Sequence, residues 1–234
     1  LIQFFHGAST MALLSVAYKI PSILVIIVSI FSAAWHISSV DHFGTEENII
    51  FFKNIYKIFN LVLSISTALC LLSTQEISRF LFKSDFFEAW NIVPVLLVAY
   101  LFQGEATFLG SVFTANKNTN VVFVSTLFGA VVNVGLNLIL IPQFSNMGAA
   151  IATLSGNFVI CLIRQILSKR YIYLGFKFLD EGFSILVLVI IAVSAYFSAL
   201  TRLIVGTIGI LMIAFIQRNT MVFLWKNIKR TTKK

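Results

Sequence analysis

The sequence predicts an all-α integral membrane protein with about seven transmembrane helices. Of its 234 residues, 59% are hydrophobic and only 11% are charged, whereas a soluble domain carries about a quarter charged residues. The mean hydropathy is +0.95. Apolar runs of roughly the ~20 residues that a bilayer core requires recur along the chain, and short polar segments separate them. These observations exclude a soluble globular domain.

The apolar runs and the three prolines indicate where the helices lie. Pro21 falls inside the first run and should kink it, Pro94 suits the first turn of a helix, and Pro142 ends an apolar run. Residues 75–93 mix aromatic and charged side chains, which is typical of an interfacial amphipathic segment. The expected spans cover residues 11–39, 49–74, 94–114, 121–142, 148–168, 183–200 and 203–225.

The fourth and fifth expected helices should form a tight hairpin. Ser125, Gly129, Asn133 and Asn137 recur at every fourth position of the fourth helix and therefore share one face. Small residues follow the turn, at the spacing that lets membrane helices approach closely. Asn133 and Asn137 are candidates for the wall of a polar cavity. The alternative is that their amides join neighbouring helices.

Lysine and arginine are unevenly divided between the two ends of the expected helices. If the seven spans alternate in direction, 13 of the 17 basic residues fall on one side. The opposite side has Arg79, Lys83 and Arg202, and Lys19 lies within a span. Because cytoplasmic loops carry the excess of positive charge, the C-terminus and the turn at 115–120 are expected to be cytoplasmic. The net charge of +8 therefore reports topology and requires no nucleic-acid partner.

The segments LLSVAYKIPSIL, FLGSVFTANKNT and VNVGLNLILIPQFSNMGAAIAT are the most distinctive motifs in the chain. They resemble the C-terminal half of Wzx-type polysaccharide flippases, and the resemblance covers nearly the whole chain. These flippases belong to the multidrug/oligosaccharidyl-lipid/polysaccharide (MOP) exporter superfamily, whose members have fourteen helices in two lobes plus a final pair. The resemblance implies a transporter lobe of five transmembrane helices (1–175), a C-terminal helix pair (176–225) and a basic cytoplasmic tail (226–234). It also implies that an N-terminal lobe is missing.

The resemblance further implies a function in the bacterial cell inner membrane. Wzx-type flippases move undecaprenyl-pyrophosphate-linked oligosaccharide repeat units across that membrane for O-antigen, lipopolysaccharide and other polysaccharide biosynthesis. The route is a central, often cationic cavity between lobes that rock in alternating access. We therefore expect a transporter and not an enzyme, with no cofactor, a lipid-linked glycan as substrate and a proton or cation as coupling ion. Half a cavity should transport nothing by itself.

Lys19 is the first candidate for a substrate contact. It lies on a polar stripe with Ser15 and Ser22 in the first expected helix, next to Pro21. A lysine inside a span costs about 2.5–3.5 kcal/mol on insertion scales, so such residues are usually functional. Its ammonium can meet a pyrophosphate as a point charge. The alternative is a lysine near the outer end of its helix that extends to the interface.

Glu105 is the only acidic residue inside an expected span, and it is the coupling candidate. Its near neighbours on the helix surface are apolar, whereas Gln103, Thr107 and Ser111 form the opposite, polar face. Since a glutamate in lipid is costly, either both faces contact protein or the glutamate faces the cavity. Two interpretations stay open: proton or cation coupling through this carboxylate, and a protonated acid bonded to a neighbouring helix.

The remaining polar residues predict no catalytic chemistry. Arg164, near the cytoplasmic end of the fifth helix, is interpreted as an anchor at the membrane surface. The three histidines and two cysteines lack metal-ligand spacing, so no metal is expected. Two other functions compete with the flippase. One is a multidrug or cation antiporter of the same superfamily, which would favour acids over a lysine on its cavity wall, and the other is a non-transporting, truncated membrane protein.

Overall fold

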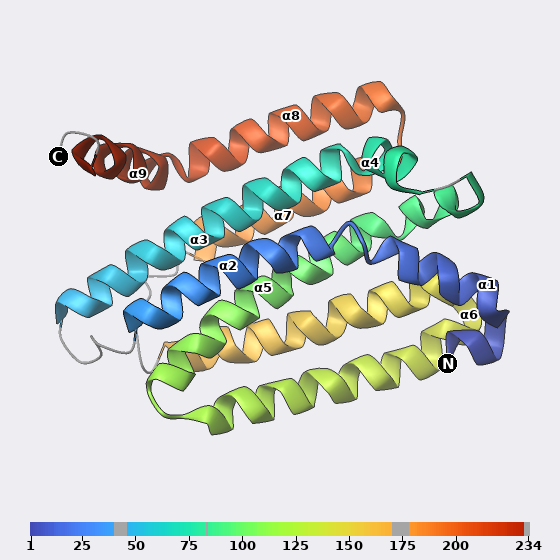
Figure 1. The fold of residues 1–234 in the computed structure, drawn as a ribbon, viewed down its shortest axis with the longest axis horizontal. Helices are drawn as coiled ribbons and strands as arrows, with labels where there is room; N and C mark the ends of the chain where they lie inside the picture. Colours follow the sequence, from blue (N-terminus) through green and yellow to red (C-terminus); the bar gives the residue numbers. More distant parts are fainter. Residues whose placement is uncertain (40–45, 83, 170–177, 232–234) are drawn as a thin grey trace.

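The computed structural model describes residues 1–39, 46–82, 84–169 and 178–231, and every regular element among them is a helix. Within these ranges, nine α-helices and one 3₁₀ helix, η1, run back and forth as an elongated bundle (Figure 1). The bounds are α1 Ile2–Ala17, α2 Ser22–Ser39, α3 Glu46–Leu72, α4 Thr74–Leu81, η1 Ser84–Asn91, α5 Val93–Ala115, α6 Thr119–Ser168, α7 Phe178–Ser194, α8 Ala199–Ile216 and α9 Arg218–Thr231.

α1 and α2 replace the single kinked helix that the sequence predicted over residues 11–39. The two helices are bent by 43° relative to each other. Pro21 supplies no N–H, and its ring crowds the carbonyl one turn earlier. The Lys19 carbonyl accepts a hydrogen bond from Ser22 Oγ at 2.6 Å. The predicted kink is confirmed, but it ends one helix and begins another, and α1 begins earlier than expected.

α6 confirms the predicted helical hairpin. Its 50 residues include Ser145, whose φ of 51° is not helical, and the chain doubles back there (Figure 1). The first limb covers residues 119–144 and the second limb covers 146–168. A Cβ on Gly129 would lie 2.8 Å from the carbonyl oxygen of Gly156, and one on Gly156 would lie 2.9 Å from that of Gly129. The two limbs therefore approach as closely as small residues allow.

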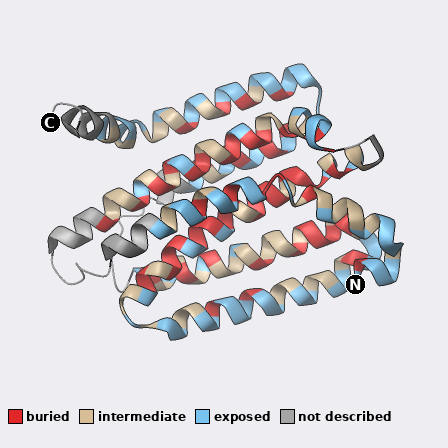
Figure 2. Ribbon diagram, viewed as in Figure 1, coloured by how far each residue is buried: buried red, intermediate tan, exposed pale blue. Residues whose placement is uncertain are grey.

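α5 lies at the centre of the bundle. It packs against α2, α3, α6 and α7, and most of its residues are buried (Figure 2). A Cβ on Gly104 would meet Leu63 of α3 at 2.8 Å and Val28 of α2 at 3.0 Å. The glycine therefore lets three helices meet at mid-span, and α5 becomes the element that positions both polar regions described below.

The outer faces of the bundle are apolar although they are exposed (Figure 2). Large hydrophobic side chains that are more than half exposed include Ile30, Phe123, Val131, Leu138, Leu211 and Phe215. A continuous surface of this kind suits acyl chains better than water. Among the described residues, four helices are long and apolar enough to cross a membrane, or five if the bent pair of α1 and α2 is counted as one span. In its described part the chain is thus all-helical, with several long apolar helices that fit a membrane-embedded protein.

Segments that the distribution of basic residues predicted on opposite sides of the membrane lie at opposite ends of the bundle. The α5–α6 turn and α9 lie at one end, whereas α4, η1 and the turn of α6 lie at the other (Figure 1). α4 and η1 are the short helices formed by the segment predicted to be interfacial. Residues 170–177 of the predicted basic loop and 232–234 of the predicted basic tail lie outside the described residues.

The C-terminal helices differ from the predicted spans at 183–200 and 203–225. α7 ends at Ser194, and α8 begins after Ser198, whose Oγ accepts a hydrogen bond from the backbone N–H of Thr201 at 3.3 Å. α8 and α9 are separate helices with Gln217 between them. The sequence QRNT at this point interrupts the apolar run, so the membrane-compatible helix ends here and a second helix begins.

Candidate functional site

A groove with polar side chains lies between α2 and α5. It has a volume of about 340 Å³. Its lining residues are Val25, Val28, Ser29, Ser32, Tyr100, Gln103, Gly104 and Thr107. Five of these, Ser29, Ser32, Tyr100, Gln103 and Thr107, carry hydroxyl or amide groups, and the larger part of the groove surface is apolar. The polar face that the sequence predicted on α5 therefore opens onto this groove and not onto the interior.

The hydroxyl groups along the groove are oriented by their own helices. Ser29 Oγ donates to the carbonyl of Ile26 at 2.8 Å, and Thr107 Oγ1 donates to the carbonyl of Gln103 at 2.8 Å. Since each hydroxyl proton is used within its helix, the oxygen lone pairs face outward as acceptors. The exposed Gln103 amide adds two donors. The groove can therefore accept and donate hydrogen bonds, as a hydroxyl-rich ligand would require.

The three candidates near Pro21 are exposed at or beside the break between α1 and α2. Lys19 is exposed, and so are Ser15 and Ser22. Ser15 Oγ donates to the Met11 carbonyl at 3.0 Å, in the same way as the groove hydroxyls. None of the three lines the groove itself. All three are exposed, whereas Glu105 is buried between α5 and α3.

Glu105 lies on the opposite side of α5, where only 5% of the residue is exposed. Tyr56 Oη donates to Glu105 Oε2 at 2.8 Å, and Asn60 Nδ2 donates to Oε1 at 2.9 Å. Both donors come from α3, so the carboxyl group bridges two helices. The conflict between the two faces of α5 is thereby explained, because the polar face is exposed in the groove and the acid contacts protein.

A cavity of about 170 Å³ adjoins the Glu105 carboxyl group. Besides residues of α3 and α5, it is lined by Phe158, Cys161, Leu162 and Gln165 of the second limb and by Ser184 and Ile185 of α7. Gln217, between α8 and α9, donates from Nε2 to Asn60 Oδ1 at 3.0 Å. The acid is therefore connected through Asn60 to the C-terminal helices.

Sequence reasoning missed the partners of Glu105. Tyr56, Asn60 and Ser64 recur at every fourth position of α3, which places them on one helix face. That spacing was the available signal for a polar surface opposite the acid. Gln217 offered no such signal, because its role depends on the break that follows α8.

Asn133 and Asn137 lie along the seam of the hairpin and not in the groove. Both are half-buried, and Asn137 Nδ2 donates to Asn133 Oδ1 at 2.9 Å within the first limb. A Cβ on Gly156 would lie 3.0 Å from Asn133 Cβ, so this asparagine packs directly against the second limb. The pair satisfies part of its own hydrogen-bonding capacity where the limbs are closest.

Arg164 forms hydrogen bonds between helices inside the bundle. Its interpretation as an anchor at the membrane surface is wrong. The residue is only 7% exposed. Its Nε donates to Ser125 Oγ at 2.9 Å and its Nη1 to the Ala106 carbonyl at 2.6 Å. Its Nη2 donates to Thr126 Oγ1 at 2.9 Å and to the Val122 carbonyl at 3.3 Å. One guanidinium on the second limb therefore joins the first limb and α5.

The fold and these polar regions define a class: a membrane-embedded helical bundle with an exposed polar groove and a buried acid on opposite sides of one central helix. Comparison of the chain with family models, curated proteins and solved structures gives no match.

Proposed function

We propose that the chain is one lobe, with the C-terminal helix pair, of a flippase that moves undecaprenyl-pyrophosphate-linked oligosaccharide repeat units across the bacterial inner membrane. The observation that carries the proposal is the groove between α2 and α5, where hydroxyl and amide groups lie among apolar side chains. Polar groups facing acyl chains are costly, so a polar face at the depth of the spans calls for protein or water beside it. A water-filled cavity shared with a second lobe meets this requirement and admits a glycan.

The proposed arrangement has seven spans. The bent pair of α1 and α2, α3, α5, the two limbs of α6, α7 and α8 would each cross once, and α9 would lie on the cytoplasmic side with the basic tail. The excess of lysine and arginine at the end that includes α9 supports this orientation. α7 has a shorter apolar segment, residues 182–194, which its packing against α3 and α8 helps to accommodate.

In this proposal Lys19 supplies the positive charge for the pyrophosphate. The residue is exposed, as are Ser15 and Ser22, and it lies beside the break that Pro21 causes. A break in a membrane helix supplies backbone groups and a change of direction, which transporters use at their binding sites. The glycan hydroxyls would contact the groove farther along α2.

Glu105 is the proposed coupling residue. Its carboxyl group is buried, bonded to neutral side chains and adjacent to a cavity, so a proton or a cation could neutralise it there. The same acid supports the second candidate, a multidrug or cation antiporter, because aromatic Phe102 and Phe158 line its cavity. The flippase is favoured because the acid faces away from the polar groove, on which no acid lies among the lining residues.

The test is translocation of a lipid-linked oligosaccharide in proteoliposomes. The resemblance implies that a second lobe completes the cavity, so the chain is assayed both alone and expressed with that lobe, and only the complete protein should transport. Lys19→Gln should lower the rate by about tenfold or more, because a charge-assisted contact is lost. Lys117→Gln, in the exposed α5–α6 turn, is the matched control and should transport normally.

Two outcomes would contradict the proposal. Equal rates for Lys19→Gln and the complete unmodified protein would remove Lys19 from the substrate path. Export of an organic cation without glycan translocation would favour the antiporter.

Glu105→Gln tests the coupling role separately. It should abolish the dependence of the rate on the proton or cation gradient, and an unchanged rate and pH profile would remove the coupling role.

A further inference from the structure

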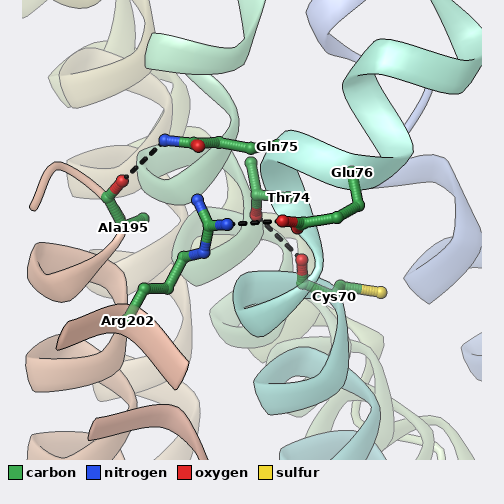
Figure 3. A network of polar contacts seen from close by, with 6 residues as sticks. All are labelled: Cys70, Thr74, Gln75, Glu76, Ala195 and Arg202. Atoms are coloured by element: carbon green, nitrogen blue, oxygen red, sulfur yellow. Dashed lines mark hydrogen bonds and ion pairs between the residues drawn. The ribbon is translucent and has the colours of Figure 1, made fainter. Parts of the chain in front are cut away.

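A buried arginine joins the first turn of α8 to α4 at one end of the bundle. The Arg202 side chain is only 2% exposed, and its Nη2 forms an ion pair with Oε1 of Glu76, whose side chain is 57% exposed. Figure 3 shows that the guanidinium extends from α8 toward α4. Next to Glu76, Gln75 Nε2 donates to the Ala195 carbonyl at 3.2 Å, between α7 and α8 (Figure 3). α4 is therefore attached to the α7–α8 pair by two adjacent side chains.

The ion pair with Glu76 uses only part of the hydrogen-bonding capacity of the Arg202 guanidinium. Arg202 Nε and Nη1 are buried and form no hydrogen bond with the residues that the structure describes, and the same is true of Ser78 Oγ on α4. An unsatisfied buried donor is costly, and more so on a charged group. Because arginine presents its donors as a fork, each of the two nitrogens shares an edge with Nη2. The Glu76 contact uses one of the three nitrogens and leaves both edges incomplete.

We propose that Arg202 is a binding site for a phosphate oxyanion, which takes the place of Glu76 on the guanidinium. A phosphate group can bond to two nitrogens along one edge, whereas Glu76 bonds to one, and bidentate charge-assisted contacts are the stronger kind.

A phosphate can replace Glu76 on Arg202 because Glu76 is exposed and Arg202 is buried. Glu76 is already more than half exposed, so its carboxylate can turn into water without a large desolvation cost. Arg202 is held inside the bundle, and it stays behind as an unpaired buried cation unless another anion arrives. Because both nitrogens are buried, entry of the anion requires the side chains that cover them to move.

The location of Arg202 favours a lipid phosphate as the source. α4 and η1 lie at one end of the bundle, beside the end of α8 (Figure 1), and the ends of membrane-spanning helices lie at the depth of the head groups in a bilayer. The exposed aromatic side chains near this end, Phe80 and Phe197, suit the same interface. This site is separate from the polar groove and does not depend on the flippase proposal.

The experiment measures anion binding to the chain in a neutral maltoside detergent by isothermal titration calorimetry. The two probes are inorganic phosphate and a monomeric short-chain phosphatidylglycerol. Glu76→Gln should bind the probe about tenfold or more tightly than the unmodified chain, because the competing carboxylate is gone. Arg202→Gln should abolish saturable binding, and Arg202→Lys should weaken it, because lysine keeps the charge and loses the fork.

The matched control is Arg79→Gln, which removes an exposed arginine from the same helix and should leave binding unchanged within about twofold. Saturable binding of both probes supports a phosphate site, and binding of phosphatidylglycerol alone assigns it to a lipid. If Arg202→Gln does not fold, the gain expected from Glu76→Gln decides the matter. Equal losses in the Arg79 and Arg202 variants, or no gain in Glu76→Gln, would overturn the proposal and leave only an ordered water at the two nitrogens.

Discussion

The contact between Arg164 and Gly110 can be tested by a double-mutant cycle. Arg164 makes four hydrogen bonds to the first limb and α5. Interhelical hydrogen bonds in membrane proteins average about 0.6 kcal/mol each, so Arg164→Met should lower the free energy of unfolding by about 2 kcal/mol. A Cβ on Gly110 would lie 2.8 Å from Arg164 Nη1 and 3.5 Å from Cζ. Gly110→Ala should therefore displace the guanidinium and cost about 1–3 kcal/mol.

The cycle separates this contact from any general effect of alanine. In the Arg164→Met background, the atom that meets the new methyl group is gone, so Gly110→Ala should be neutral or stabilising by up to about 1 kcal/mol through helix propensity. The expected coupling free energy is thus about 2 kcal/mol. The assay is reversible unfolding in mixed micelles by increasing fractions of a denaturing detergent.

Gly135→Ala is the matched control for the cycle, because no atom lies within 4 Å of a Cβ at that position. It should leave the free energy of unfolding unchanged or slightly raised in both backgrounds. If Gly110→Ala has the same cost with and without the Arg164 guanidinium, the two changes are additive and the proposed tie between α5 and the hairpin is wrong.

Two further changes test the packing of the hairpin and the bonds of the buried acid. Gly129→Ala should lower the free energy of unfolding by more than about 2 kcal/mol, because the new Cβ would lie 2.2 Å from Ile160 Cγ1 and 2.8 Å from the Gly156 carbonyl oxygen. An effect as small as that of Gly135→Ala would contradict the close packing of the two limbs. Tyr56→Phe removes a donor from the Glu105 carboxyl group and should cost about 1–3 kcal/mol in the same unfolding assay, and no loss would mean that the bond contributes nothing.

The local features of the fold were predictable because each depends on a short stretch of sequence. Pro21 necessarily interrupts helical hydrogen bonding, and Pro142 with the small residues after it indicates a hairpin. The break at Gln217 was equally local, in the polar run QRNT, but the apolar residues after it extended the expected span to Trp225. The error therefore came from hydropathy averaged over a window, which tolerates a short polar interruption.

The polar sites could not be predicted in the same way, because their partners are distant in the chain. Arg164 bonds to residues 38 to 58 positions away, and Glu105 bonds to residues 45 and 49 positions away. The sequence identified Glu105 as unusual and left open which face of α5 points inward. Only the packing of α3 against α5 decides that question, since it gives the acid two donors and exposes Gln103 on the other side.

Asn60 offers a last test, because it lies between Glu105 and Gln217. Its Nδ2 donates to Glu105 and its Oδ1 accepts from Gln217, so the two contacts fix the orientation of the amide. Asn60→Asp would place a second carboxyl group against the first, and two carboxylates in contact cannot both be ionised without strong repulsion. One proton must then be retained in the folded state while the unfolded chain is fully ionised. The folded state therefore binds more protons than the unfolded state, and stability must fall as the pH rises above about 4.

The magnitude of this effect follows from the linkage of proton binding to folding. Each retained proton costs up to about 1.4 kcal/mol per pH unit over that range, so Asn60→Asp should be much less stable at neutral pH than at mildly acidic pH. Asn60→Leu is the matched control, since it loses both hydrogen bonds and adds no titrating group, and its deficit relative to the unmodified chain should vary less with pH. Parallel pH profiles for the two variants would mean that the aspartate turns away from Glu105, and that the amide orientation inferred for Asn60 is wrong.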